Sequence, residues 1–276
     1  MPVFPPKPNA LLEIFGREKV LIGTVHSHPL PGSPRYAGES LEETYAFAVE
    51  EARRFKEGGF HGVIVENSWD IPFSKPEDIG LETAAAMAVL AERVAEVGLP
   101  VGVNVLANGV ACSLAVAKAA GGRFVRANQW VNAYVANEGY IEGPAPAATR
   151  YRSWIRADDV KVFADVHVKH GSHAIVADRP LDELTRDAEF FDADVLIATG
   201  QRTGGAAELS EINGIRDATG LPVIIGSGIT LENARELLSA CDGAIVASSL
   251  KEDGVWWNPV EVSRVDAMAK LADEIW

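Results

Sequence analysis

The sequence predicts an α/β fold of the (βα)8 or TIM-barrel type, with eight parallel strands in a single domain spanning residues 1–276. Short apolar segments alternate with amphipathic helical segments from end to end, an order typical of parallel sheets. The length of 276 residues is usual for such a barrel. An open doubly wound sheet is the alternative, but no G-x-G-x-x-G fingerprint follows the first predicted strand.

Eight short segments are predicted as strands because they are rich in small and β-branched apolar residues, as strands covered on both faces are. In chain order they span residues 20–25, 61–66, 101–106, 123–127, 160–166, 194–199, 223–225 and 242–249. Helical periodicity between and after them predicts helices at 41–55, 81–97, 110–120, 148–156, 180–191, 209–218, 231–238 and 257–275.

Residues at the helix boundaries support these assignments. Ser40 and Glu43 have the spacing of a capping box at the start of helix 41–55. Pro180 suits the first position of helix 180–191, since proline has no amide to leave unpaired there. Thr230 is expected to be the N-cap of helix 231–238.

Two segments fall outside the alternation. Residues 1–18 are predicted to be an N-terminal extension of the barrel. Residues 128–147 show no clear period, and a loop of that length in a compact domain is usually a lid or a binding segment. We therefore expect 128–147 to be an active-site loop insertion.

Composition excludes several classes of partner. The formal net charge is −14, from 25 basic and 39 acidic residues, whereas nucleic acids and anionic membranes call for a basic face. No apolar run approaches the roughly 18 residues of a membrane span, and the first residues lack the apolar core of a signal peptide. A cytoplasmic protein without integral membrane association is expected, with Cys112 and Cys241 as reduced core residues.

Polar residues follow nearly every predicted strand, at the end where barrels of this class place their working residues. Any one of them could simply be a polar loop residue, but the set as a whole indicates a site. Those predicted to bind substrate are His26, Asn67, Arg126, Asn128, Thr199, Gln201 and Thr203.

The densest cluster follows the fifth predicted strand. Asp165, His167 and Lys169 would share one face if the strand continues that far. Three uses are then possible. Lys169 could be a Schiff-base nucleophile, or Asp165 and His167 could act as a general base and a general acid. Alternatively, the three residues could simply bind an acidic substrate. A surface Lys–Asp pair is the structural alternative. With the residues that end the second and third strands, the predicted catalytic set is Asp165, His167, Lys169, Glu66 and Asn104.

A phosphate site is predicted after the last two strands. Glycines at 226 and 228 let the backbone approach a ligand closely, although many strand-to-helix turns contain glycine. A helix N-terminus behind such a turn attracts anions, and the last two loops of these barrels often hold a phosphate. The predicted phosphate-binding residues are Gly226, Ser227, Gly228, Ser248 and Ser249.

The sequence supports a metal site less strongly than it supports the phosphate site. The pair His26 and His28 resembles the paired histidines of metal-dependent hydrolase barrels. That pattern also needs a histidine after the sixth strand and an aspartate after the eighth, where this chain has Thr199 and Ser248. No cofactor and no metal ligand are therefore predicted, while a weaker divalent site at Glu66, Asp70 or Asp165 stays open.

Several segments together resemble the BtpA family over almost the whole length, from about Lys19 to the last helix. The resemblance implies a fold similar to the ribulose-phosphate-binding barrels. It also implies a role in photosystem I biogenesis in cyanobacteria and a sugar-phosphate or nucleoside-related enzymatic role elsewhere. His28 departs from the family, since many relatives look apolar there. The motifs are Val25-His26 with Pro29-Leu30-Pro31-Gly32-Ser33-Pro34, Gly62-Val63-Ile64-Val65-Glu66-Asn67, Val101-Gly102-Val103-Asn104-Val105-Leu106, Phe163-Ala164-Asp165-Val166-His167-Val168-Lys169-His170, Thr199-Gly200 with Thr203-Gly204, Gly226-Ser227-Gly228, and Asp242-Gly243 with Ser249-Leu250-Lys251.

The leading functional hypothesis is an enzyme that acts on a small phosphorylated sugar or nucleoside-like metabolite. It would be a C–C lyase of the aldolase type through Lys169, or a hydrolase or isomerase through Asp165 or Glu66. The alternatives are a non-catalytic biogenesis factor for a photosystem or membrane complex, and a metal-dependent hydrolase. An assembly factor would show an exposed apolar patch; Trp256 and Trp257 are candidates, but core or oligomer packing is favoured for them, and a homo-oligomer is expected.

Overall fold

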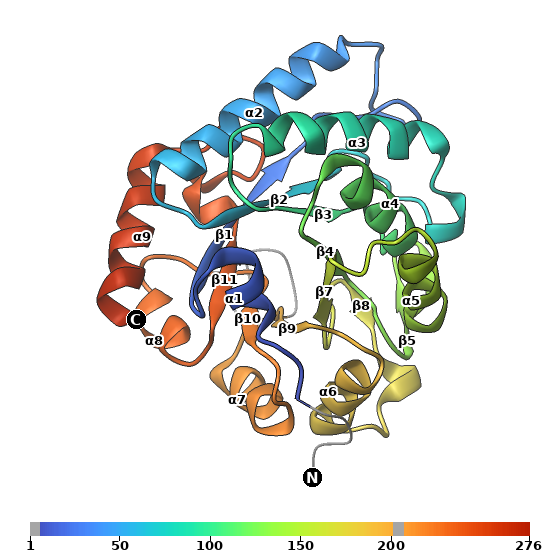
Figure 1. The fold of residues 1–276 in the computed structure, drawn as a ribbon, viewed down its shortest axis with the longest axis vertical. Helices are drawn as coiled ribbons and strands as arrows, with labels where there is room; N and C mark the ends of the chain where they lie inside the picture. The colour runs from blue at the N-terminus through green and yellow to red at the C-terminus, as the bar shows by residue number, and fades with distance from the viewer. Residues whose placement is uncertain (1–5, 201–206) are drawn as a thin grey trace.

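Eight parallel strands close into a barrel in the computed structural model, which describes residues 6–200 and 207–276 (Figure 1). Around the ring the order is β1-β11-β10-β9-β7-β4-β3-β2, so β1 pairs with both β11 and β2. The predicted fold class is confirmed. The strands are β1 (Val20–His26), β2 (Gly62–Glu66), β3 (Val101–Asn104), β4 (Phe124–Ala127), β7 (Lys161–Asp165), β9 (Val195–Ala198), β10 (Val223–Ile225) and β11 (Gly243–Val246).

Helices surround this ring and cover its outer face (Figure 1). They are α2 (Leu41–Glu57), α3 (Leu81–Ala95), α4 (Val110–Ala120), α5 (Ala145–Trp154), α6 (Leu181–Phe190), α7 (Leu209–Ala218), α8 (Ala234–Ser239) and α9 (Val262–Ile275). Short 3-10 turns occur at η1 (Pro76–Asp78), η2 (Ala174–Val176), η3 (Ser248–Leu250) and η4 (Glu252–Gly254).

The two faces of each strand have different neighbours. Alternate side chains such as Ile22 and Ile64 pack in an apolar cluster inside the barrel, whereas Leu21 and Val63 pack outward in the cluster that includes the helices. This is the period-two pattern of a strand that is buried on both faces. The inward positions near the carboxyl ends carry polar residues instead, namely His26, Glu66, Asn104, Arg126 and Asp165.

A short helix that the sequence analysis did not predict covers the N-terminal end of the barrel. Helix α1 (Ala10–Phe15) lies in front of the ring on the side of β1, β11 and β10 in Figure 1. Its buried Leu11 and Ile14 belong to the same apolar cluster as the inward side chains of the strands. Asn9 caps it, since its side-chain oxygen accepts hydrogen bonds from the amides of Leu11 and Leu12 at 3.0 and 3.2 Å. Residues of the predicted N-terminal extension therefore contribute to the apolar core of the barrel.

The predicted loop 128–147 contains a β-hairpin. Strands β5 (Ala133–Ala136) and β6 (Gly139–Glu142) pair antiparallel, and β5 also pairs with β8 (Gly171–Ser172). The sequence analysis missed these strands because each is only two to four residues long. The small sheet connects the chain after β4 to the chain after β7, and the rest of 128–147 forms turns and the start of α5.

Helix α8 differs from its prediction. It begins at Ala234, and Asn233 rather than Thr230 occupies the N-cap position. The Asn233 side chain stabilises the preceding turn instead: its Oδ1 accepts from the amide of Thr230 and its Nδ2 donates to the carbonyl of Gly228, both at 2.9 Å. At α2, Ser40 is the N-cap as predicted, but its side chain makes no capping hydrogen bond.

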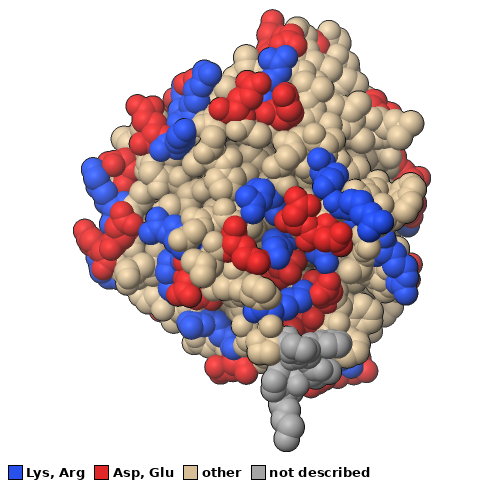
Figure 2. Space-filling model, in the orientation of Figure 1, with Lys and Arg blue, Asp and Glu red and all other residues tan. Residues whose placement is uncertain are grey.

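Acidic and basic side chains are interspersed on the face seen in Figure 2, which is the face that α1 covers. Ion pairs here join distant segments, such as Lys19 with Asp242 at 3.0 Å and Lys161 with Glu13 at 2.6 Å. On this face the acidic residues therefore do not form a continuous negatively charged surface.

Cys112 and Cys241 are both free thiols, and Cys241 is buried in the core. Within residues 6–200 and 207–276, no helix has the length and apolar character needed to cross a membrane.

Candidate active site

A continuous polar network lines the inside of the barrel near the carboxyl ends of β2, β3, β4 and β7. Asn104 Nδ2 donates to Glu66 Oε1 at 3.0 Å, and Arg126 Nη1 lies 3.8 Å from the same oxygen. Arg126 Nε and Nη2 donate to the two oxygens of Asp165, both at 3.0 Å. The Asn128 side chain also donates to Asp165. Four strands are thus joined by one buried chain of charge-assisted hydrogen bonds.

Gly226 makes room for the guanidinium group of Arg126. A Cβ at position 226 would lie 2.9 Å from Arg126 Nη2 and 2.5 Å from a methyl group of Ile197. The Gly226 amide donates to the carbonyl of Ala198 at 2.8 Å, as part of the sheet. The structure therefore places Gly226 in the barrel wall, whereas the sequence analysis assigned it to the phosphate turn.

Burial and Arg126 have opposite effects on the carboxyl group of Asp165. Burial raises its pKa, while the bidentate contact with Arg126 opposes that shift. Both carboxylate oxygens already accept hydrogen bonds from Arg126. In this arrangement Asp165 orients and neutralises the guanidinium rather than presenting a free oxygen as a general base.

Lys169 lies close enough to this network to be affected by its charges. Burial, followed by the positive charge of Arg126, lowers the pKa of the partly buried Lys169 amine to about 8, while Asp165 and Glu66 oppose the shift. Lys169 forms no ion pair with any carboxylate in the described part of the chain. Loss of its proton near neutral pH, which gives the nucleophilic form, is therefore easier for this amine than for an ordinary lysine.

His167 is separate from this cluster, contrary to the sequence prediction. That prediction depended on the strand reaching residue 169, but β7 ends at Asp165 and the chain bends directly after it. The His167 ring stacks on His173 at 3.8 Å between ring centroids, and His173 in turn stacks on Tyr134 of β5 at 5.3 Å. Burial lowers the pKa of His167. Its side chain thus packs with the small sheet. The prediction that Asp165, His167 and Lys169 share one face of a strand is therefore wrong.

His26 is a neutral histidine inside the barrel next to Glu66, its partner across the β1–β2 pair. Its Nδ1 lies 3.0 Å from the carbonyl oxygen of Trp256, and since a carbonyl only accepts, Nδ1 must carry the proton. Nε2 is then the unprotonated nitrogen. Burial, followed by the charge of Lys251, lowers the pKa of His26 to about 4.

Asn67 joins loops, although it was predicted to bind substrate. Its Oδ1 accepts from the amide of Leu106 at 2.7 Å, and its Nδ2 donates to Asp70 at 3.0 Å and to the Leu106 carbonyl at 3.4 Å. Asp70 accepts from the amide of Leu30 at 2.9 Å. Its hydrogen-bonding groups are engaged within the protein, so Asn67 positions the loops after β1, β2 and β3.

The turns after β10 and β11 lie side by side. Gly228 has a positive φ of 77°, and Ser249 Oγ donates to the carbonyl of Ile229 at 2.7 Å. The hydrogen bonds of the 3-10 turn η3 begin with the Leu250 amide, which donates to Ala247, so the amides of Ser248 and Ser249 precede the first intrahelical donor. Gly228, Ser248 and Ser249 are thus brought together as predicted, and Ser227 is buried beside them.

Lys251 has a structural role after β11. Its amine forms an ion pair with Glu51 of α2, and both side chains are 1% exposed. Glu51 also accepts from the amide of Val260 at 2.7 Å. This pair connects the loop after β11 to the helical layer.

At the end of β9, Thr199 contacts Glu211, a residue that the sequence did not single out. Thr199 Oγ1 donates to the carbonyl of His167 at 2.9 Å, and the Thr199 amide donates to Glu211 of α7 at 3.4 Å. Burial raises the pKa of Glu211. Only its place in the first turn of a helix distinguished Glu211 in the sequence. The predicted Gln201 and Thr203 lie outside the described residues.

Several buried oxygens in the described part of the chain accept no hydrogen bond. They include the Oδ1 atoms of Asn104 and Asn128, at the two ends of the polar network. A buried acceptor without a partner costs free energy, so these atoms are suited to donors supplied by a ligand, such as sugar hydroxyl groups.

Metal ligands do not gather in the described ranges, where no group of three or more His, Cys, Asp or Glu side chains could hold a metal ion. The rings of His26 and His28 have different surroundings, because His28 stacks on Phe47 of α2 at 4.4 Å. The carboxylate of Asp165 accepts hydrogen bonds from Arg126. The carboxylate of Asp70 accepts from the backbone amide of Leu30 and the side-chain amide of Asn67.

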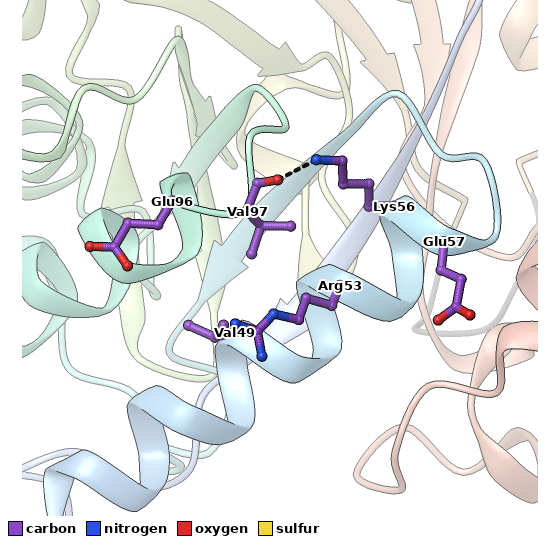
Figure 3. A pocket seen from close by; sticks show the side chains of 6 residues that line it. All are labelled: Val49, Arg53, Lys56, Glu57, Glu96 and Val97. Carbon is purple, nitrogen blue, oxygen red and sulfur yellow. Dashed lines mark hydrogen bonds between the residues drawn. The ribbon is translucent and has the colours of Figure 1, made fainter.

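A surface hollow of about 530 Å³ lies between α2 and α3 (Figure 3). Lys56 Nζ donates to the carbonyl of Val97 across it at 2.6 Å. It is on the outer helical layer, away from the barrel interior, and none of its lining residues was a predicted site residue. They are Val49, Arg53, Lys56, Glu57, Glu96 and Val97.

Comparison with known proteins gives consistent matches across the chain. The model of the BtpA family matches residues 17–274. An uncharacterised protein of Pyrococcus furiosus is 38% identical over 259 residues, covering 94% of this chain and 96% of its own length. The photosystem I biogenesis protein BtpA of Synechocystis is 36% identical over 272 residues, covering 96% and 91%. Among solved structures, the thiamine phosphate pyrophosphorylase of Pyrococcus furiosus is similar in fold, with a TM-score of 0.55, 20% identity, and coverage of 94% and 96%.

Proposed function

This chain belongs to the BtpA family, and we propose from the geometry of its barrel interior that it is an enzyme that acts on a small phosphorylated sugar or nucleoside-like compound through the amine of Lys169. The observation that carries the proposal is the position of the partly buried Lys169 amine beside the buried network of Glu66, Arg126 and Asp165. Burial there lowers the pKa of Lys169 to about 8. Surface lysines titrate near pH 10.4 and are almost fully protonated at neutral pH, so a lysine tuned in this way suits nucleophilic catalysis.

The phosphate group of the substrate would bind at the turns after β10 and β11. Amides of Ser248 and Ser249 ahead of the first intrahelical bond, together with the turn at Gly228, supply donors of the kind that phosphate oxygens accept. A similar fold occurs in a thiamine phosphate pyrophosphorylase, which supports the choice of a phosphorylated ligand. The sugar hydroxyl groups would donate to Asn104 and Asn128.

The reaction begins with addition of the neutral Lys169 amine to a carbonyl carbon of the substrate. The carbonyl oxygen leaves as water after it is protonated, and an iminium ion forms on Lys169. The substrate's β-hydroxyl group then loses its proton, the Cα–Cβ bond breaks, and the β-carbon leaves as an aldehyde while the bond electrons convert the iminium ion into an enamine. Protonation of the enamine and hydrolysis release the second product and free the Lys169 amine. His26 Nε2 and the Glu66 carboxylate are proton acceptors at the same level of the barrel.

Reductive trapping tests this proposal. The protein is incubated with dihydroxyacetone phosphate or ribose 5-phosphate, reduced with borohydride and analysed by peptide mass spectrometry. We expect an adduct on Lys169 whose yield rises with pH and is half-maximal near pH 8, because only the neutral amine adds to a carbonyl.

Lys251 is the matched control, because it is also a buried lysine after a barrel strand but is paired with Glu51. It should stay unlabelled, and Lys169→Arg should abolish the adduct. Labelling of surface lysines to the same extent as Lys169, or no adduct on Lys169, would contradict the lyase proposal.

A non-catalytic assembly role is the second candidate, and the name of the Synechocystis relative favours it. In that case the barrel mouth would have no substrate, and Lys169→Arg would leave the function of the protein unchanged in a cell that depends on it.

A further inference from the structure

Three tryptophans form a cluster at the carboxyl end of the barrel, and neither the catalytic proposal nor the phosphate site uses them. Trp69 follows β2, while Trp256 and Trp257 lie in the connection from β11 to α9. Ring centroids are 4.8 Å apart for Trp69 and Trp256, 5.5 Å for Trp256 and Trp257, and 6.3 Å for Trp69 and Trp257. Segments almost 190 residues apart in the chain are thus joined by aromatic contacts. We call these three residues the tryptophan cluster.

The tryptophan cluster is only partly covered by protein. Trp257 is 55% exposed, and Trp69 and Trp256 are half-buried. The guanidinium carbon of Arg35 lies 5.9 Å from the centroid of Trp69, within the range of a cation–π contact. Large indole surfaces therefore remain accessible next to a planar cation, a combination that suits stacking with a flat ring.

The cluster is directly connected to the polar interior of the barrel. Trp256 contacts the His26 ring edge-on, at 5.4 Å between centroids, and its carbonyl oxygen fixes the His26 tautomer. The connection that carries Trp256 and Trp257 begins with Ser248 and Ser249, in the phosphate turn. Two buried hydroxyl oxygens without a described partner, Ser27 Oγ and Ser68 Oγ, are adjacent in sequence to His26 and Trp69.

We infer that the tryptophan cluster binds a planar aromatic ring of nucleobase size on the substrate. This rests on the proposed function and narrows it from phosphorylated sugars in general to a phosphorylated nucleoside or a similar compound. The ring stacks on the indoles, the sugar hydroxyl groups meet the unpartnered oxygens, and the phosphate lies at Ser248 and Ser249.

Calorimetric titration with AMP, ribose 5-phosphate and adenosine tests the inference. AMP is expected to bind about ten-fold more tightly than ribose 5-phosphate, because stacking of one base on an aromatic side chain contributes about 1–3 kcal/mol, and ten-fold corresponds to about 1.4 kcal/mol. Trp257→Ala should weaken AMP and adenosine binding about ten-fold and leave ribose 5-phosphate within two-fold. Trp257→Phe should retain most of the affinity for AMP.

The matched control is Trp154→Ala, which removes a 77% exposed tryptophan on α5 and should change none of these affinities. Equal affinities for AMP and ribose 5-phosphate, or equal losses for both in Trp257→Ala, would overturn the inference and leave the phosphate proposal standing. Adenosine binding that depends on Trp257, without any gain from a phosphate group, would support the inference and count against the phosphate proposal. Absence of Trp257-dependent binding of AMP and of adenosine would also overturn it.

Discussion

Arg126 is the residue on which the polar interior depends. It is 5% exposed, and its guanidinium group makes a bidentate contact with Asp165 and approaches Glu66 at 3.8 Å. Removing two carboxylates and a guanidinium from water is costly, so each charge needs the others. The space for Arg126 exists because residue 226 has no side chain.

Replacing Arg126 by Met is expected to lower the free energy of unfolding by about 3–5 kcal/mol, because the buried carboxylate of Asp165 loses its partner. Urea denaturation at neutral pH measures the change. The double variant Arg126→Met with Asp165→Leu should recover part of the loss, since only the Glu66 carboxylate, which still accepts from Asn104, then stays buried without Arg126.

Arg235→Met is the control for this prediction. Its pair with Glu274 is exposed by 63% and 65%, and such a pair contributes about 0–1 kcal/mol. The account of Arg126 is wrong if Arg126→Met costs no more than Arg235→Met, or if the double variant is as unstable as Arg126→Met alone.

At the scale of elements, two short additions complete the barrel at opposite ends. Helix α1 places Leu11 and Ile14 against the inward apolar side chains at the N-terminal end. The small sheet of β5, β6 and β8 lies beyond the carboxyl ends of β4 and β7, where Tyr134 and His173 stack. The first closes the apolar interior, and the second covers part of the polar end.

Truncation of Leu11 to Ala should destabilise the protein by about 2–5 kcal/mol, because Leu11 is fully buried and its removal leaves a cavity under the barrel. Thermal or urea unfolding measures the loss. Leu12→Ala is the matched control in the same helix, since Leu12 is 49% exposed and its truncation should change stability by about 0.5 kcal/mol or less. Equal effects of the two changes would show that α1 does not close the core.

For the whole molecule, two histidines that are neutral in the fold, one buried and one partly buried, make stability sensitive to acid. The pKa is lowered to about 4 for His26 and for His61, and burial is the main cause in both. His61 Nδ1 accepts a hydrogen bond from the amide of Leu21 at 2.8 Å, which a protonated ring could not do. Between pH 6.5 and about 4 the unfolded chain binds protons that the folded chain does not, so stability falls as the pH falls through this window.

His26→Asn is expected to reduce this loss. The unfolded and folded pKa values of His26, 6.5 and about 4, correspond to on the order of 2–3 kcal/mol between pH 7 and 4.5. Urea denaturation of both proteins at these two pH values measures it; nearby Glu66, Lys169 and Lys251 are unchanged in the variant. If the variant loses as much stability in acid as the wild type, His26 is not buried as a neutral group.

The sequence by itself determined the barrel and the level at which its polar residues lie. Eight apolar segments with polar ends suffice for this, because burial on both faces and the short connections between strands and helices are local properties of the chain. Glu66, Asn104, Arg126 and Asp165 were all found in this way, since each lies at or next to the end of an apolar run.

Only the tertiary structure decided which of these residues meet. Arg126 was predicted to bind substrate, yet it pairs with Asp165; His167 was placed beside Asp165, yet it stacks on His173. These outcomes depend on the end of β7 at Asp165, on the space at Gly226 and on the pairing of strands from distant parts of the chain. Trp69 and Trp256 likewise become neighbours only when β2 and β11 flank β1. Local periodicity contains no information on such contacts, because closure of the barrel sets which loop ends face one another.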